Sequence, residues 1–210
     1  MVDIMSKASM EVKVWPYDVY LPNHPGKSEL QIISPVQLTL SQKEGELAED
    51  PFSTDPRLHL GFNAFSGSGD VTAEVVYVNY GTREDFMKLV EMGVPLKGKI
   101  AIARYGGNFR GYKAKFAEQN GMIGLVVYTD PKDSGFTRGD VYPKGPFYNE
   151  TTIQRGSMLT LDFTGDPLTP NRAALPLDGP VKIKRDDPAT VDFHTIPVTP
   201  IGYGAAKEIL

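Results

Sequence analysis

The sequence predicts an α/β domain with a partly parallel sheet, a few flanking helices and long loops. Three observations predict it. Strand-like and helix-like segments alternate between residues 71 and 128, and this alternation requires crossover connections between parallel strands. Residues 123–128 form a continuous apolar run, which is typical of a strand buried on both faces. The 17 prolines and 21 glycines place much of the remaining chain in turns and loops.

The expected strands of the core have a β-branched, aromatic or continuously apolar composition. They are residues 71–80, 99–104, 123–128 and 196–200. Residues 11–21 and 30–40 also alternate or cluster apolar residues, so strands are expected there too. The acidic stretch 44–55 has no periodic apolar face, which indicates a solvated loop.

Two helices are expected between the core strands. The first begins after Thr82, a suitable cap ahead of acidic residues in the first turn, and it ends before Gly93. The second spans residues 112–120, and Gly121 after it suits the left-handed C-cap position. Residues 201–210 favour a further helical segment that meets no stop signal before the last residue. We therefore interpret the chain as a segment cut from a longer protein.

Composition limits the classes of function. The chain has 210 residues, 40% hydrophobic and 23% charged, which is typical of a soluble globular domain. Its net charge of −4 and pI near 5.4 argue against a nucleic-acid partner. The absence of cysteine excludes disulfides, thiolate metal sites and a cysteine nucleophile. No apolar run reaches the ~20 residues of a membrane span, and the first ten residues do not resemble a signal peptide.

The sequence offers no catalytic constellation, and no catalytic residue is assigned. The three histidines, His24, His59 and His194, lack the spacing of a metal site and are interpreted as structural or surface residues. No Gly-x-Ser-x-Gly elbow is present, and residues 66–69 (Ser-Gly-Ser-Gly) are typical of a flexible loop.

A glycine-rich segment, residues 104–111, lies between an expected strand and an expected helix. It lacks the Gly-Lys-Ser/Thr ending of a phosphate-binding loop and the Gly-x-Gly-x-x-Gly pattern, so nucleotide binding is not favoured. Within it, Arg110 could present its planar guanidinium to a carboxylate. The segment alone leaves two interpretations open: a surface salt bridge, or a ligand contact.

Several ordered blocks of the sequence resemble the protease-associated, or apical, domain of the glutamate carboxypeptidase II and transferrin receptor family. The blocks are residues 70–86, 98–106, 109–111, 124–131, 154–156, 165–170 and 196–203. The resemblance implies a mixed β-sheet or β-sandwich core with flanking helices. It also implies an N-terminal extension over residues 1–16 and a protease-associated domain over residues 17–210, with long loops around 41–69 and 132–195.

The resemblance further implies a role. Peptidases of this family hold two zinc ions in a separate catalytic domain, so this chain is expected to be a non-catalytic part that caps the active-site cleft and contributes to the substrate pocket. The implied partners are the parent's own catalytic domain, a peptide with a free C-terminal carboxylate, and a second copy of the parent in a homodimer. The parent is expected to be exported from the cytoplasm.

Four positions match functional positions of the family. Arg110 corresponds to an arginine that holds a substrate carboxylate, and Ser157 to a pocket position that is often asparagine in glutamate-specific enzymes. The shorter serine implies a broader dipeptidase or aminopeptidase specificity. Thr169 and the carbonyl of Arg172 correspond to ligands of a structural calcium ion, a site that is incomplete within this chain.

Two other functions stay open at this point. One is a protein-interaction module of a receptor-like homologue that has lost its metals, against which the Arg110-Gly111 pair argues. The other is a self-contained enzyme, which would need a catalytic constellation that the sequence does not offer.

Residues 149–151 (Asn-Glu-Thr) also form a glycosylation sequon.

Overall fold

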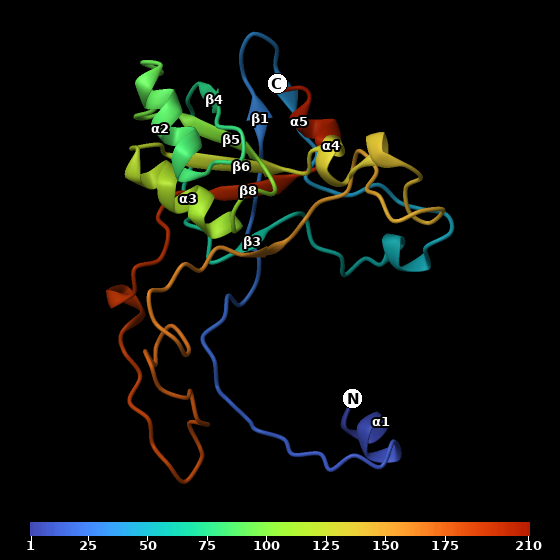
Figure 1. The fold of residues 1–210 in the computed structure, drawn as a ribbon, viewed down its shortest axis with the longest axis vertical. Helices are drawn as coiled ribbons and strands as arrows, with labels where there is room; N and C mark the ends of the chain where they lie inside the picture. Colours follow the sequence, from blue (N-terminus) through green and yellow to red (C-terminus); the bar gives the residue numbers. More distant parts are fainter. The chain divides into compact units, whose positions relative to one another are not determined.

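A computed structural model describes residues 1–210 of the chain (Figure 1). The chain divides into two compact units. The larger unit contains residues 22–160 and 193–210, and the smaller unit contains residues 1–21 and 161–192. The predicted boundary between residues 16 and 17 stays a prediction.

The larger unit is built on a four-stranded sheet in the order β4-β5-β6-β8, and all its neighbouring strands are parallel. These strands are β4 (Val75–Tyr77), β5 (Ile100–Arg104), β6 (Gly124–Tyr128) and β8 (Val198–Ile201). Helix α2 (Arg83–Glu91) connects β4 to β5, and α3 (Arg110–Gln119) connects β5 to β6. With its parallel and antiparallel sheets and few helices, the fold confirms the predicted α/β class.

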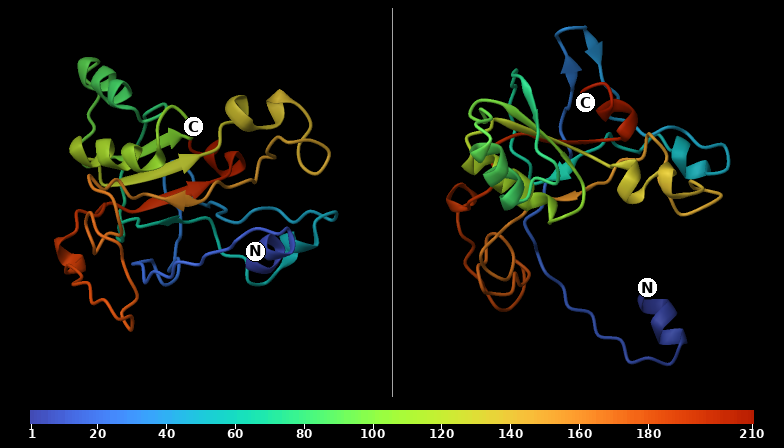
Figure 2. Two further views of the ribbon diagram at one scale, coloured as in Figure 1. Left: turned by 60° about the horizontal axis from the view of Figure 1, so that its bottom comes forward. Right: turned by 45° about the horizontal axis from the view of Figure 1, so that its top comes forward.

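Alternate residues of the central strands face two different layers, because side chains along a strand point to opposite faces. Ala101 and Ala103 of β5 pack in one buried cluster with Phe86 of α2 and Ala114 of α3. Their small side chains let α3 approach the sheet closely, and α2 and α3 lie on the same side of the sheet (Figures 1 and 2). The intervening residues pack in a second cluster that includes α5 (Tyr203–Ala206). Its buried members are Ile102, Val126, Tyr128, Ile201 and Ala206.

Helix α2 begins as the sequence predicts. The Thr82 hydroxyl accepts a hydrogen bond from the Asp85 N–H at 3.2 Å, and the Asp85 carboxylate accepts one from the Thr82 N–H at 3.0 Å. This reciprocal capping box satisfies two N–H groups that lack partners within the helix. Burial opposes ionisation of Asp85, but hydrogen bonds from Asn79 and Thr82 hold the pKa of this carboxyl below its usual value.

Helix α3 begins earlier than the sequence predicts. It starts at Arg110 rather than at residue 112, after Phe109 in an extended conformation without a side-chain cap. Arg110 therefore lies in the first turn of a helix, and not in a loop ahead of one. No capping residue marks this start in the sequence, which explains the error.

Further elements of the larger unit are short. β3 (Asn63–Ala64) pairs in parallel with β7 (Gly156–Ser157), and β1 (Gln31–Ile32) pairs antiparallel with β2 (Leu38–Thr39). The remaining elements are α4 (Pro131–Ser134) and the 3-10 turns Pro51–Thr54 and Phe136–Arg138. The strand expected over residues 30–40 is thus a small hairpin.

The smaller unit has no sheet. It contains α1 (Val2–Lys7) and a 3-10 turn (Pro188–Thr190), and hydrogen bonds around Asp18 hold its two chain segments together. The Asp18 N–H donates to the carbonyl of Ala174 at 2.9 Å, and the Asp18 carboxylate accepts from the N–H of Leu177 at 2.7 Å. The strand predicted over residues 11–21 is wrong, because these residues pair with no other strand. In neither unit is any helix both long and apolar enough to cross a membrane.

Candidate carboxylate-binding site

The structure brings Arg110 and Ser157 together within the larger unit. The Nη2 group of Arg110 donates to the side-chain oxygen of Gln154 at 2.9 Å, and Nη1 donates to the backbone carbonyl of Ser157 at 3.4 Å. The Ser157 carbonyl belongs to β7, which pairs in parallel with β3, and Gln154 lies just before this strand. Residues 154–156 are one of the resembling blocks, but the contact of Gln154 with Arg110 could not be foreseen, because it joins residues 44 positions apart in the chain.

Gly156 leaves the space in which the guanidinium lies. A Cβ atom at this position would come within 2.2 Å of Arg110 Nη1 and 2.4 Å of Cζ. The guanidinium therefore lies directly against the backbone of β7, and any side chain at Gly156 would displace it.

Aromatic rings border the same guanidinium. Its Cζ lies 5.4 Å from the ring centroid of Phe109 and 5.7 Å from that of Tyr105, within the range of cation–π attraction. The Tyr105 hydroxyl donates to the carbonyl of Gln154 at 2.8 Å and accepts from the side-chain amide of Asn63 at 3.3 Å. Burial raises the pKa of Tyr105, so this hydroxyl stays neutral and keeps its proton for the Gln154 contact.

The hydrogen-bond partners of Arg110 are all neutral. No carboxylate forms an ion pair with it, and its buried Nε–H has no acceptor. A half-buried guanidinium without a counter-charge is complementary to a carboxylate ligand. The structure thus differs from the salt-bridge interpretation that the sequence left open.

The hydroxyl of Ser157 is partly engaged. Its oxygen accepts a hydrogen bond from the N–H of Leu159 at 3.1 Å. Its proton is not needed for that bond and can be donated to a ligand oxygen. The guanidinium of Arg110 and the hydroxyl proton of Ser157 can therefore both donate to one anionic group.

Thr169 and Arg172 lie in the smaller unit. The Thr169 hydroxyl is buried without a partner, and a Cβ atom at Gly165 would lie 2.7 Å from the Thr169 carbonyl and 2.8 Å from the Arg172 carbonyl. The carbonyls of Thr169 and Arg172 therefore both lie close to Gly165, and the Thr169 carbonyl accepts a hydrogen bond from the Arg172 N–H at 3.0 Å. Backbone carbonyls of this kind can form part of a calcium site. Calcium takes about six to eight oxygen ligands, so these residues alone do not complete one.

No group of three or more His, Asp or Glu side chains in the structure is arranged to hold a metal ion. His24 accepts a hydrogen bond from the N–H of Gly26 within a turn. His194 is buried, with Nδ1 2.8 Å from the Glu118 carboxylate and Nε2 2.8 Å from the carbonyl of Met158. The residues of this chain do not fit a zinc site.

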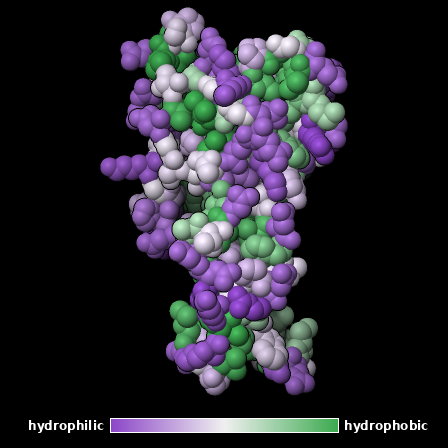
Figure 3. Space-filling view, turned by 90° about the vertical axis from the view of Figure 1, so that its left-hand side faces the viewer, coloured by the Kyte–Doolittle hydropathy of each residue, from purple (hydrophilic) through white to green (hydrophobic).

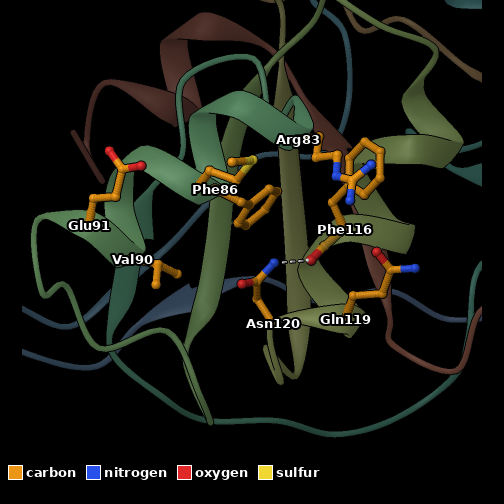
Figure 4. Close-up of a pocket in the computed structure, with 8 residues that line it drawn as sticks. Arg83, Phe86, Val90, Glu91, Phe116, Gln119 and Asn120 are labelled. Atoms are coloured by element: carbon orange, nitrogen blue, oxygen red, sulfur yellow. Dashed lines mark hydrogen bonds between the residues drawn. The ribbon is translucent and has the colours of Figure 1, made fainter.

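A separate groove of about 310 Å³ lies between α2 and α3 (Figure 4). Its lining residues are Arg83, Phe86, Met87, Val90, Glu91, Phe116, Gln119 and Asn120. Figure 3 faces the side on which these helices lie and shows hydrophobic side chains interspersed with hydrophilic ones. The groove is mainly apolar and shares no lining residue with the Arg110 site, so we place the candidate site at Arg110.

Comparisons with known proteins find a family match and several relatives of this chain. The PA domain family matches residues 71–160, a range that contains Arg110 and Ser157. A probable glutamate carboxypeptidase of Arthroderma benhamiae is 47% identical over 73% of this chain and 22% of its own length. The glutamate carboxypeptidase 2 homolog of Caenorhabditis elegans is 39% identical over 70% of this chain and 19% of its own length.

Aminopeptidase NAALADL1 of Mus musculus is 33% identical over 94% of this chain and 27% of its own length. Among solved structures, the aminopeptidase from Aneurinibacillus sp. strain AM-1 is 34% identical over 32% of this chain and 15% of its own, with a TM-score of 0.29. That last match is too limited to bear on the fold. The chain spans between 19% and 27% of the three curated relatives, which are much longer proteins.

Proposed function

Because the chain carries the protease-associated domain of the glutamate carboxypeptidase-like exopeptidases, we propose that it is the non-catalytic, substrate-recognising part of such a peptidase. In this role it caps the active-site cleft of a catalytic domain in a longer protein. Arg110 binds the free C-terminal carboxylate of the peptide. The observation that carries the proposal is the guanidinium of Arg110, held by neutral acceptors only.

The geometry supports a recognition step without chemistry. Gln154 orients the Nη2 edge of Arg110, and the backbone of β7 supports its Nη1 edge. A carboxylate that enters meets a fixed guanidinium and the Ser157 proton, so less side-chain entropy is lost on binding. Because the serine is short, we propose a dipeptidase or aminopeptidase specificity broader than glutamate.

We assign the catalytic metal ions of the proposed parent to residues outside this chain. We propose that two zinc ions act in its catalytic domain, and no step of hydrolysis is assigned to this chain. Thr169 and the Arg172 carbonyl are proposed to hold a structural calcium ion together with carboxylates of the longer protein. Export from the cytoplasm and a homodimer complete the proposal for the parent.

Replacing Arg110 with alanine in the longer peptidase tests this function. We expect KM for peptides with a free C-terminus to rise about 10- to 150-fold, because a hydrogen bond to a charged group contributes about 1.5–3 kcal/mol. Steady-state kinetics on free-acid and C-terminally amidated forms of one peptide would measure it. Arg83→Ala is a matched control, since Arg83 is the first residue of α2 as Arg110 is of α3. Equal effects on both peptide forms would contradict the proposal.

A second variant displaces the guanidinium without removing its charge. Gly156→Ala is expected to raise KM for the same free-acid peptides about tenfold, since small misplacements of a binding group are costly. The new Cβ would occupy the position of Arg110 Nη1. Gly69→Ala serves as the control, because a Cβ there meets nothing closer than 3.7 Å. If Gly156→Ala kept the wild-type KM, the guanidinium would have to act from another position.

A further inference from the structure

Lys113 is a cation enclosed in the larger unit. Its side chain has no exposed surface, and no carboxylate forms an ion pair with its ammonium group. Burial lowers the pKa of Lys113 to about 8, against the opposing charge of Asp85, so the group still carries its proton at neutral pH. An ammonium has three protons to donate, and each must find an acceptor in a buried position.

All three protons of Lys113 have acceptors. Nζ donates to the carbonyl of Tyr80 at 2.5 Å, to the carbonyl of Gly106 at 2.7 Å and to the side-chain oxygen of Asn108 at 2.8 Å. The Asn108 amide in turn donates to the carbonyl of Gly81 at 3.2 Å. Lys113 therefore joins the turn that follows β4 to residues 105–109, which we call the glycine loop.

Two residues of the glycine loop have backbone conformations that favour glycine. Gly106 and Gly107 have φ values of +102° and +73°, which favour glycine. A Cβ at Gly107 would lie 2.8 Å from the Cβ of Tyr80, so the loop packs directly on that residue. The loop is thus held in place by close packing and by the Lys113 ammonium together.

The glycine loop leads straight into Arg110. Phe109, the last loop residue, caps α3 without any side-chain hydrogen bond. Arg110 follows it, and Lys113 lies one turn further along the same helix. The position of the loop consequently sets where the first turn of α3 begins, and with it the distance from the guanidinium to Gln154 and Ser157.

We propose that Lys113 is a positioning residue for carboxylate recognition: its ammonium fixes the glycine loop so that Arg110 presents its guanidinium at a constant place. The inference rests on the proposed function of Arg110. It assigns Lys113 no contact with the ligand, because its three protons are engaged inside the domain.

Two substitutions at Lys113 distinguish a positioning role of its ammonium group from simple filling of space by its side chain. Lys113→Met keeps the length of the side chain but removes all three donors, and Lys113→Arg keeps donors in a different shape. In the longer peptidase, Lys113→Met is expected to raise KM for free-acid peptides about tenfold, with kcat and the amidated peptides unchanged. Lys113→Arg should recover part of this loss. Lys88→Met, on the exposed face of α2, is the matched control.

A second measurement uses the 210-residue chain itself. In hydrogen exchange followed by NMR, Lys113→Met should speed exchange of the Asn108 and Tyr112 amides at least about tenfold, while amides in β6 keep their protection. If Lys113→Met does not fold, Asn108→Ala replaces it in the same assays. This variant removes one acceptor of the Lys113 ammonium group and the hydrogen bond to the Gly81 carbonyl.

The outcomes distinguish the two proposals. No selective effect of Arg110→Ala overturns the proposed function, and the inference with it. A selective effect of Arg110→Ala together with unchanged kinetics in a folded Lys113→Met or Asn108→Ala variant overturns the inference alone. Equal KM changes on free-acid and amidated peptides for Lys113→Met also overturn it, because they would indicate a general loss of structure.

Discussion

Replacing Phe86 with alanine is expected to lower the free energy of unfolding of the 210-residue chain by about 3–5 kcal/mol. Phe86 is 1% exposed and packs between α2 and the sheet, in a cluster with Val78, Leu96 and Ala103. Truncation loses the transfer free energy of the ring and leaves a cavity that the surrounding strands cannot fill. Because domains have a net stability of only about 5–15 kcal/mol, this single change removes a large share of it.

Urea denaturation followed by circular dichroism measures this effect. Met87→Ala is the matched control on the same helix, because Met87 is 54% exposed and its truncation should change stability by no more than about 0.5 kcal/mol. A loss below about 1 kcal/mol for Phe86→Ala, with an unchanged denaturant slope, would show that α2 does not depend on this contact.

The core could be predicted from the sequence because its signals are local. The continuous apolar run before Tyr128 marks β6, and Thr82 with Asp85 marks the start of α2. Both depend on residues within a few positions of each other, and buried parallel strands need no partner-specific pattern. The same reasoning failed at residues 11–21, where the apolar pattern was present but no strand paired with it. A strand forms only with a partner, and the sequence does not state which partner is near.

Two residues of the candidate site could be predicted from the sequence, but the contacts that hold them in place could not. Arg110 and Ser157 came from a resemblance, and the structure places them in contact through the Ser157 carbonyl, not its hydroxyl. Residues 154–156 belong to a resembling block, but the contacts of Gln154 and Gly156 with Arg110 could not be foreseen, because they join segments that lie far apart in the chain. Lys113 had a signal that was missed: it lies four positions before Ala117, on the buried side of α3. A lysine on the buried side of a helix indicates a buried cation that stabilises the surrounding structure.

The second large effect concerns Glu118, near the end of α3. One carboxylate oxygen accepts hydrogen bonds from the Thr195 N–H, the Thr195 hydroxyl at 2.9 Å and the Ile196 N–H at 3.1 Å. The other lies 2.8 Å from Nδ1 of His194. A single side chain thus holds α3 to the segment that enters β8, and it satisfies two backbone N–H groups that would otherwise lack partners.

These contacts make the stability of the chain depend on pH. Burial disfavours the charged carboxylate, but the hydrogen bonds from His194, Thr195 and Ile196 outweigh it and hold the pKa of Glu118 below its usual value of 4.5. A carboxyl with a lowered pKa in the folded state binds fewer protons than in the unfolded state. Its contribution to stability is therefore complete above about pH 4.5, and it is lost as the pH falls through the lower folded-state pKa.

Glu118→Ala is accordingly expected to lower the free energy of unfolding by about 3 kcal/mol at pH 7, because two backbone N–H groups and the Thr195 hydroxyl lose a charged acceptor. The difference from the wild-type chain should narrow steadily as the pH falls from 5 toward 3, because the wild-type carboxylate is then protonated and loses the same interactions. Urea denaturation at several pH values measures both. Glu118→Gln keeps the shape of the side chain but removes its charge, so it should show the same weaker dependence of stability on pH with a smaller loss of stability at pH 7. Glu91→Ala, at an exposed position of α2, should change neither the stability nor its dependence on pH. A constant difference at every pH would mean that the charge of Glu118 is not what binds α3 to β8.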